Sequence, residues 1–433
     1  MLSSCCHRLK ACLFAAFLLT QSGAARSEDI AATVLHAFDT QDGWYLSGGL
    51  IADSAGALYG VAQMGGRHDA GTVYRLTPPA SGAEEWHFDV LHRFGGGWTD
   101  GFGPANELIR DSTGSLYGVT TKGGRGGAGI VFRLTPPAGG TSEWTESILY
   151  SFSDADDGGY PEGPLLLDSA GSLYGVTEHS SGRSACSLGC GSIFKLSPAG
   201  AGAGEWTETV LYRFQGDHDG AMPSGGLIFD TTGDLLGLTV SGGTAAGGTI
   251  FQLTPPKPPA TAWSKEILHN FTATPDGSGP GGRLAVGPAN SLYGTTEGGG
   301  GGRGTIFKLT PSSASETGWR TEVLYSFGNA GSGAGEGDPR SGVIVSGDGS
   351  LFAALAFGGL GGLGAVIRLD PPPGPGETAW HETVLQGFGA RPDLGIYPTG
   401  ALAVGPSGAL FGTAMMQGPQ GGGTVFMIAA PER

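Results

Sequence analysis

The chain has 433 residues and a net charge of −16 at pH 7. Its 84 glycines make up about 19% of the residues (84/433), against roughly 7% in an average protein. The glycines follow no G-X-Y period, which excludes a collagen-like rod. The acidic balance and the lack of a Lys/Arg cluster in the sequence argue against a nucleic-acid partner.

The first 25 residues differ in composition from the rest. A short basic region with Arg8 and Lys10 precedes an apolar stretch at 11–19, and small residues follow at 22–25. This order is typical of a secretory signal peptide and predicts a secreted or periplasmic protein. The alternative is an N-terminal membrane anchor, but the apolar stretch is shorter than the about 20 residues that span a bilayer. We therefore expect no membrane span in the mature chain.

Two cysteines, Cys186 and Cys190, remain once 1–25 are removed. An isolated pair in an oxidising compartment predicts a disulfide that closes a small loop. A C-x-x-x-C metal or redox pair is the alternative, but no second Cys/His pair stands nearby in the sequence.

Seven copies of one repeat fill the remaining chain. Each has four apolar runs of five to eight residues, rich in Val, Ile, Leu, Phe and Thr and bounded by turn residues, which predicts strands and no helices. D-x-x-G links such as 53–56 fit tight hairpins between the first and second runs. The second run carries a large residue at a fixed position, and 57 to 62 residues separate successive copies: Tyr59, Tyr117, Tyr174, Leu236, Tyr293, Phe352 and Phe411.

The fourth run has the form W-x-x-x-[VI]-L-x-x-F, and one lone run of this type, at 34–38, stands before the first complete copy. The chain stops after a third-type run at 424–428. Pairing of these two runs would complete the last set and remove the open sheet edges of an array. The sequence therefore predicts an all-β, seven-bladed β-propeller as a single domain over 26–433, with an open β-solenoid as the alternative. The repeated tryptophans are expected to pack in the core and not to form a sugar platform.

The repeated G-x-L-Y-G-V-T-x-x-G-G and G-T-x-F-x-L-T-P segments resemble the GloVer repeat of bacterial "choice-of-anchor" extracellular tandem-repeat proteins. The C-x-x-x-C-G-S-I-F segment at 186–194 is also similar to a form found in that family. The resemblance implies export and a propeller-like body, with no activity or catalytic residue to transfer. Two features depart from it: FAALA at 352–356, where LYGVT is typical, and an end without an apolar anchor, which favours release from the cell.

The loops between second and third runs and between fourth and first runs fall on one face of such a propeller. The residues that enter the innermost strands from this face vary in charge and should point at the axis: Glu107, Glu162, Ser224, Arg283, Arg340 and Thr399. They could bind a zwitterionic or sugar-like ligand through charge-assisted hydrogen bonds. Alternatively, salt bridges among them plug the channel.

Three polar residues on loops of the same face, His179, His218 and Asp219, are further candidates, with solvated loops as the alternative. The run 154–158, D-A-D-D-G, lacks the Glu of an EF-hand, although calcium binding through another loop geometry stays an alternative. We assign no catalytic residue, metal ligand or cofactor, because the sequence has no G-x-S-x-G, H-E-x-x-H or Walker loop. The favoured function is a monomeric, non-enzymatic scaffold that binds an extracellular glycan, peptide or protein. The alternative is a propeller lyase or hydrolase acting at the channel mouth.

Overall fold

The computed structural model describes residues 32–80, 85–138, 143–179, 186, 189–198, 205–315, 317–328, 337–374 and 376–430. The expected signal peptide at 1–25 lies outside these residues. In the part of the chain that is described, no helix is both long enough and apolar enough to cross a membrane.

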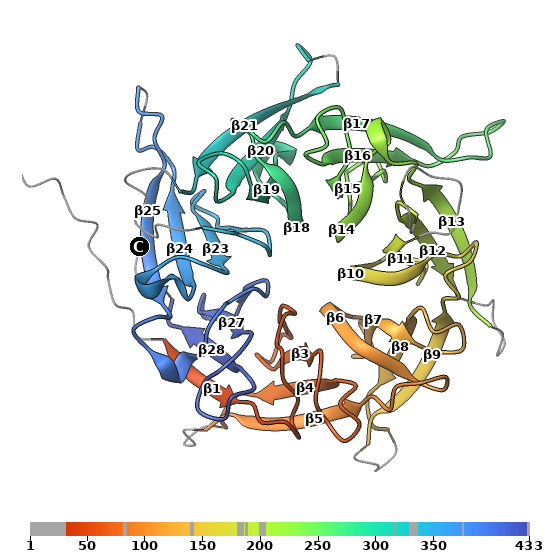
Figure 1. The fold of residues 1–433 in the computed structure, drawn as a ribbon, viewed down its shortest axis with the longest axis vertical. Coiled ribbons are helices and arrows are strands. Elements are labelled where there is room, and N and C mark those ends of the chain that lie inside the picture. The colour runs from red at the N-terminus through yellow and green to blue at the C-terminus, as the bar shows by residue number, and fades with distance from the viewer. Residues whose placement is uncertain are drawn as a thin grey trace, which may run out of the picture.

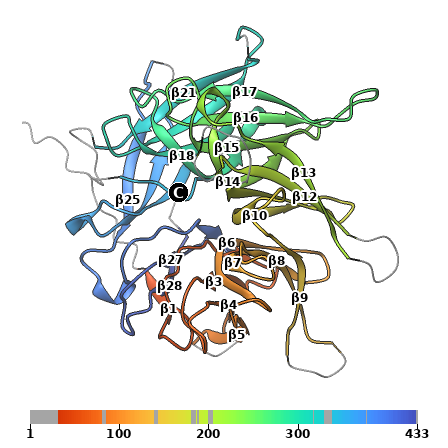
Figure 2. The same cartoon turned by 45° about the vertical axis from the view of Figure 1, so that its right-hand side comes forward.

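The strands form seven antiparallel sheets of four strands, arranged as the blades of a ring (Figures 1 and 2), so the predicted seven-bladed β-propeller is confirmed. Blades one to three contain β2 (Ile51–Ala52), β3 (Leu58–Ala62), β4 (Thr72–Thr77) and β5 (His87–Arg93); β6 (Gly101–Arg110), β7 (Leu116–Gly123), β8 (Ile130–Thr135) and β9 (Thr145–Ser151); and β10 (Gly159–Leu167), β11 (Leu173–His179), β12 (Ser192–Ser197) and β13 (Thr207–Arg213).

Blades four to six contain β14 (Ala221–Phe229), β15 (Leu235–Ser241), β16 (Thr249–Thr254) and β17 (Ser264–Asn270); β18 (Ser278–Val286), β19 (Leu292–Gly298), β20 (Thr305–Pro311) and β21 (Trp319–Ser326); and β22 (Ile344–Val345), β23 (Leu351–Leu355), β24 (Ala365–Asp370) and β25 (His381–Gly387). Short 3₁₀ turns cover Asp217–Asp219, Pro288–Asn290, Leu360–Gly362 and Pro392–Leu394.

Blade seven contains strands from both ends of the chain: β26 (Ala403–Val404), β27 (Leu410–Ala414), β28 (Thr424–Ile428) and β1 (Thr33–Ala37). β1 is its outermost strand and pairs antiparallel with β28, with Thr33 opposite Met427 and Ala37 opposite Thr424. Figure 1 shows β1 and β28 side by side. The lone strand before the first repeat thus lies where the sequence places it.

The Asp of each D-x-x-G link fixes the hairpin between the two innermost strands. In blade one, Asp53 accepts hydrogen bonds from the backbone amides of Ala55 and Ala57 and, at 3.1 Å, from the hydroxyl of Tyr59. Gly56 takes a φ of 84°, which suits a glycine. The aromatic position of the second run therefore holds the turn of its own blade.

The residues that end and open the fourth runs join neighbouring blades. Phe94, at the end of blade one, is fully buried with its ring centroid 5.1 Å from that of Phe132 in blade two. Trp144, which opens the outer strand of blade two, lies 6.5 Å from Tyr59 in blade one. Phe38, after β1, packs 4.8 Å from Tyr74 across the junction between blades seven and one. The six repeated tryptophans are all partly buried and pack against the apolar core clusters, as was expected.

The innermost strands carry an irregularity next to the axis. In β10 the pairing with β11 jumps from Glu162 to Leu166 while the partner strand advances by only two residues, and β6, β14 and β18 have the same bulge. Glycines of the bulges approach one another: a Cβ on Gly225 would overlap the carbonyl oxygen of Gly282, and one on Gly282 would overlap the amide of Gly342. Glycine is needed here because neighbouring blades touch backbone to backbone around the axis.

Candidate functional site

All six residues that the sequence selected at the inner-strand entrances line one cavity at the axis. Its volume is about 210 Å³, and its wall includes Glu107, Glu162, Ser224, Arg283, Arg340 and Thr399. We call it the axial cavity.

The strand register places these residues at two levels. Glu162 lies opposite Val176 and Ser224 opposite Leu238, whereas the equivalent places in β6 and β18 belong to Ala105 and Gly281. Glu107 and Arg283 lie two residues further along their strands. The six residues that the sequence grouped together therefore separate into an upper level, with Glu162 and Ser224, and a lower level, with Glu107 and Arg283. Arg340 and Thr399 occupy the sequence position of the upper level in blades six and seven.

The lower level separates the axial cavity from a second space along the axis. This second cavity, of about 360 Å³, shares Glu107 and Arg283 with the first, and most of its remaining wall is apolar, including Val343, Ile344 and Leu402. An Nη1 atom of Arg283 lies 3.9 Å from an Oε2 atom of Glu107, and only 16% of the Glu107 side chain is exposed. Burial raises the pKa of Glu107 above its usual value, and the charge of Arg283 opposes this shift.

Glu162 on the upper level is a further carboxylate whose ionisation the cavity changes. Within the described residues it has no hydrogen bond or ion pair. Burial, together with repulsion from Glu178, raises the pKa of Glu162 to about 7. At neutral pH its side chain is therefore present in both protonation states, so it can donate or accept a proton.

The upper level also offers hydrogen-bonding atoms without a protein partner. The buried hydroxyls of Ser224 and Thr399 make no hydrogen bond within the described part of the chain. Arg340 donates through Nε and Nη2 to one oxygen of Asp338, at 3.0 and 2.8 Å, and its side chain is 46% exposed. Ion pairing thus closes only part of the channel, and the expected alternative of a complete salt-bridge plug is not what the geometry shows.

The three loop candidates lie away from this cavity's lining. His179, at the end of β11, packs its ring 4.5 Å from that of Tyr160. His218 is exposed in the 3₁₀ turn Asp217–Asp219. Asp219 holds two blades together, because it accepts hydrogen bonds from Tyr212 at 2.7 Å and from Lys265 at 2.6 Å. For Asp219 the structure therefore shows a packing contact between blades.

The structure also places the cysteines and the acidic run. Cys186 and Cys190 form the predicted disulfide. In the run 154–158, Asp157 accepts hydrogen bonds from Ser153, Ala155 and Tyr150. Its oxygens thus stabilise the turn before β10.

Several residues of the axial cavity were not selected from the sequence. They include Ser47, Asn106 and Glu297. Glu297 directly follows the second run of blade five, as Glu178 follows that of blade three. An acidic residue at this place in the repeat is the sequence feature that could have identified Glu297 as a cavity residue. This signal is weak because the same position is Val240 in blade four.

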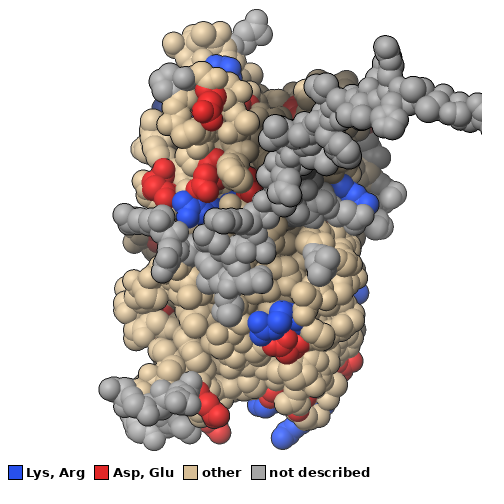
Figure 3. All heavy atoms as spheres, turned by 90° about the vertical axis from the view of Figure 1, so that its left-hand side faces the viewer, with Lys and Arg blue, Asp and Glu red and all other residues tan. Residues whose placement is uncertain are grey.

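Figure 3 shows one side of the outer wall of the ring. On the side shown in Figure 3, acidic and basic side chains are scattered among uncharged ones, and several lie next to a side chain of opposite sign. The coloured part of this face carries no continuous basic patch.

Two solved structures show the same fold at low sequence identity. PorZ, an essential bacterial surface component of the type-IX secretion system of Porphyromonas gingivalis, is 15% identical with a TM-score of 0.53, and the match covers 91% of this chain and 47% of PorZ. The extracellular domain of a putative one-component system from B. thetaiotaomicron is 14% identical with a TM-score of 0.50, covering 94% and 42% of the two chains. The chain thus spans less than half the length of either protein.

No curated protein matches the sequence. The family model described as the Gloeobacter/Verrucomicrobia repeat matches residues 19–200 and 182–426, nearly the whole chain. With the seven repeats visible as seven blades, the chain belongs to the Gloeobacter/Verrucomicrobia repeat family.

Proposed function

We propose that this protein is an exported, non-enzymatic scaffold whose axial cavity binds an acidic sugar unit of an extracellular glycan. The observation that carries the proposal is the convergence, on one cavity, of two arginines with two buried hydroxyls that lack a protein partner. A carboxylated sugar needs both kinds of group, because its acid pairs with guanidinium and its hydroxyls exchange hydrogen bonds with serine and threonine.

The arginines are accessible to such a ligand. The side chains of Arg283 and Arg340 are 44% and 46% exposed, and the Nη1 atom of Arg340 is free of hydrogen bonds to described residues. Their positive charge faces the cavity from blades five and six. Ser224 and Thr399 contribute from blades four and seven, so a ligand on the axis would contact groups from opposite sides of the ring.

The size of the cavity supports a single sugar unit. About 210 Å³ is less than the roughly 300 Å³ at which pockets for drug-sized ligands begin. The rest of a glycan would extend over the loops of the same face. Export is supported by the order of charged, apolar and small residues at 1–25 and by the surface and extracellular placement of the two structural neighbours.

The test is a binding titration of the mature protein with oligosaccharides that contain a hexuronate unit, beside neutral oligosaccharides of equal length. We expect binding of the acidic series, and Arg340→Gln should weaken it at least about tenfold, equivalent to about 1.4 kcal/mol. Arg391→Gln is the matched control, because Arg391 makes the same kind of close pair with Asp393 away from the axis. The proposal fails if no acidic oligosaccharide binds, or if Arg340→Gln and Arg391→Gln bind alike.

One observation favours a second candidate, a lyase or hydrolase at the same cavity. The pKa of Glu162, raised to about 7, suits a group that transfers a proton at neutral pH. If a bound glycan is cleaved, Glu162→Gln should abolish turnover while leaving binding within a few-fold. A bound glycan that stays intact over long incubation excludes this candidate.

A further inference from the structure

Among the described residues, four junctions between blades share a polar arrangement near the rim, made by His36 and Asp42, Tyr150 and Asp157, Tyr212 and Asp219, and His269 and Asp276. Two residues before the buried Phe at the end of an outer strand, a Tyr or His bonds to an Asp that precedes the next inner strand. Tyr150 bonds Asp157 at 3.2 Å in one junction, and His269 bonds Asp276 at 2.8 Å in another. A third residue, from the outer strand of the next blade, completes each junction.

The third residue decides the chemistry of the junction. Strand register gives this place to Thr321 in β21, opposite Leu309, and to Glu208 in β13, opposite Leu196. In the junction between blades one and two, the same place holds Glu146, opposite Leu134. Its partners there are His92 and Asp100, so this junction contains an imidazole and two carboxylates.

His92, Asp100 and Glu146 converge on a point between them. The Nε2 atom of His92 lies 3.7 Å from a carboxylate oxygen of Asp100 and 3.7 Å from one of Glu146. Each side chain is less than a fifth exposed. In the equivalent junction, His269 and Asp276 form a hydrogen bond of 2.8 Å. The distance of 3.7 Å between His92 and Asp100 is too long for a hydrogen bond, and this is the junction that also contains Glu146.

Two atoms of the cluster have no hydrogen-bond partner among the described residues. They are Nε2 of His92 and Oε1 of Glu146, and both are shielded from solvent. Buried polar atoms in folded proteins almost always have a partner. Asp100 is held in place by the backbone amides of Gly95 and Gly101, at 2.5 and 2.6 Å, as metal-binding carboxylates commonly are.

We propose that His92, Asp100 and Glu146 bind one divalent transition-metal ion of the zinc type between blades one and two. In a tetrahedral zinc site, bonds of about 2.0–2.2 Å place the ligand atoms about 3.3–3.6 Å apart, close to the separations found here. Nitrogen with carboxylate oxygen suits zinc and its neighbours better than calcium, which takes oxygen ligands. Among the described residues, no other three His, Cys, Asp or Glu side chains converge in this way.

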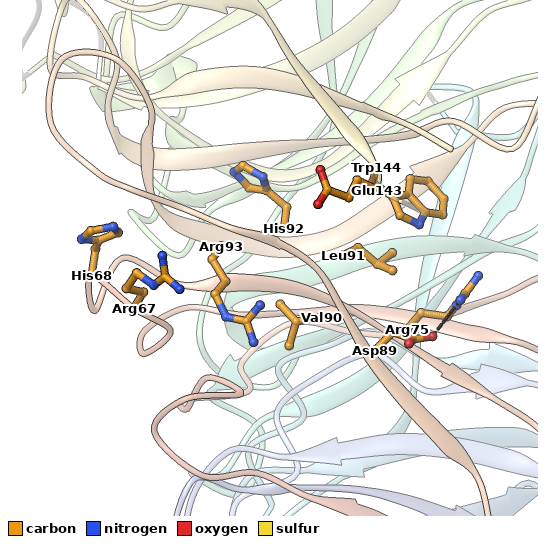
Figure 4. Close-up of a pocket in the computed structure, with 10 residues that line it drawn as sticks. All are labelled: Arg67, His68, Arg75, Asp89, Val90, Leu91, His92, Arg93, Glu143 and Trp144. Carbon is orange, nitrogen blue, oxygen red and sulfur yellow. Dashed lines mark hydrogen bonds and ion pairs between the residues drawn. The ribbon is translucent and has the colours of Figure 1, made fainter. Parts of the chain in front are cut away.

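Access to the cluster comes from the outer wall. A surface cavity of about 460 Å³ lies between the outer strands β5 and β9, and His92 lines it together with Arg93, Glu143 and Trp144 (Figure 4). Three protein ligands leave a fourth coordination position for water. The ion would link the outer strands of two blades, where the matched junctions use a direct hydrogen bond.

The test measures zinc bound to the full mature chain, purified without a histidine tag and freed of metal with a chelator. Equilibrium dialysis with elemental analysis should give one tightly bound Zn²⁺ per chain, and added Zn²⁺ should raise the Tm. Co²⁺ as a probe should give the visible absorption bands of a tetrahedral nitrogen and oxygen site.

Two variants recreate junctions that this chain already folds with. His92→Tyr copies the Tyr150, Asp157 and Glu208 junction, and Glu146→Thr copies the His269, Asp276 and Thr321 junction. Each should lower the zinc affinity at least about 100-fold while the circular dichroism spectrum stays unchanged. His269→Tyr is the matched control and should keep the affinity. The proposal is overturned if the native chain binds no Zn²⁺, if His92→Tyr binds it as the native chain does, or if His269→Tyr loses it equally.

Discussion

Arg283 and Glu107 face each other across the axis of the ring, with Nη1 of the arginine 3.9 Å from Oε2 of the glutamate. They belong to blades five and two, and 176 residues of sequence separate them. The pair stands where the polar axial cavity meets the more apolar second cavity. It therefore places one positive and one mostly buried negative group where the two cavities meet.

The two halves of this pair should differ in their effect on stability. Arg283→Gln leaves a mostly buried carboxylate without its opposing charge, whereas Glu107→Gln leaves an arginine that is 44% exposed and can be hydrated. At pH 8 we expect Arg283→Gln to lower the free energy of unfolding by about 1–2 kcal/mol and Glu107→Gln by less than about 0.5 kcal/mol. Urea unfolding of both variants checks this, and equal losses would contradict the asymmetry.

Gly225→Ala should disrupt the contact between blades four and five. Gly225 has a φ of +73°, and a Cβ there would overlap the carbonyl oxygen of Gly282. Gly97 is the control, because its φ is +75° and a Cβ would meet nothing within 4 Å. Gly97→Ala should cost about 1–2 kcal/mol for the backbone alone. Gly225→Ala should cost at least about 2 kcal/mol more in the same urea titration, and similar costs would show that the close approach is unimportant.

The pH dependence of stability should report on Glu162. Its pKa of about 7 in the folded protein lies above the usual value of a glutamate, so between about pH 4.5 and 7 the folded state binds more protons than the unfolded state. The stabilising contribution of the protonated form is therefore present at low pH and lost as pH rises through 7. Glu162→Gln should remove this loss and make the variant more stable than the native chain at pH 8, by about 1–2 kcal/mol.

The control for this measurement is Glu266→Gln, on the exposed side of β17. Thermal unfolding from pH 5 to pH 8 compares the three proteins. We expect the Glu266→Gln profile to follow the native one. A Glu162→Gln profile that also follows it would show that Glu162 ionises normally.

Tyr74→Phe should stabilise the protein. Tyr74 is fully buried in β4, and its hydroxyl has no hydrogen-bond partner in the described structure. The equivalent places in β8, β12 and β16 hold Phe132, Phe194 and Phe251. Removing an unpaired buried hydroxyl should raise the free energy of unfolding by about 1 kcal/mol. Tyr59→Phe should lower the free energy of unfolding, because the Tyr59 hydroxyl donates a hydrogen bond to Asp53. Differential scanning calorimetry of both variants checks the two signs, and a Tyr74→Phe variant that is less stable than the native chain would contradict the prediction.

The sequence by itself determined the blades. Strand length, D-x-x-G turns and the fixed aromatic positions are local signals, and each acts within one repeat, as the hydrogen bond from Tyr59 to Asp53 shows. Repetition also indicated that neighbouring copies must cover one another's apolar faces. The lone run at 34–38 had only one place to pair, and it lies against β28.

Only the tertiary structure decided how the residues of the axis and the rim combine. Glu107 and Glu162 were expected in one group, but Glu162 directly follows Pro161 whereas Glu107 lies three residues after the equivalent Pro104, so the strand register sets them on different levels. His92, Asp100 and Glu146 stand on three separate segments of two blades, and each looks ordinary in its own repeat. Their meeting depends on the packing of one blade against the next, a long-range relation that no local pattern contains.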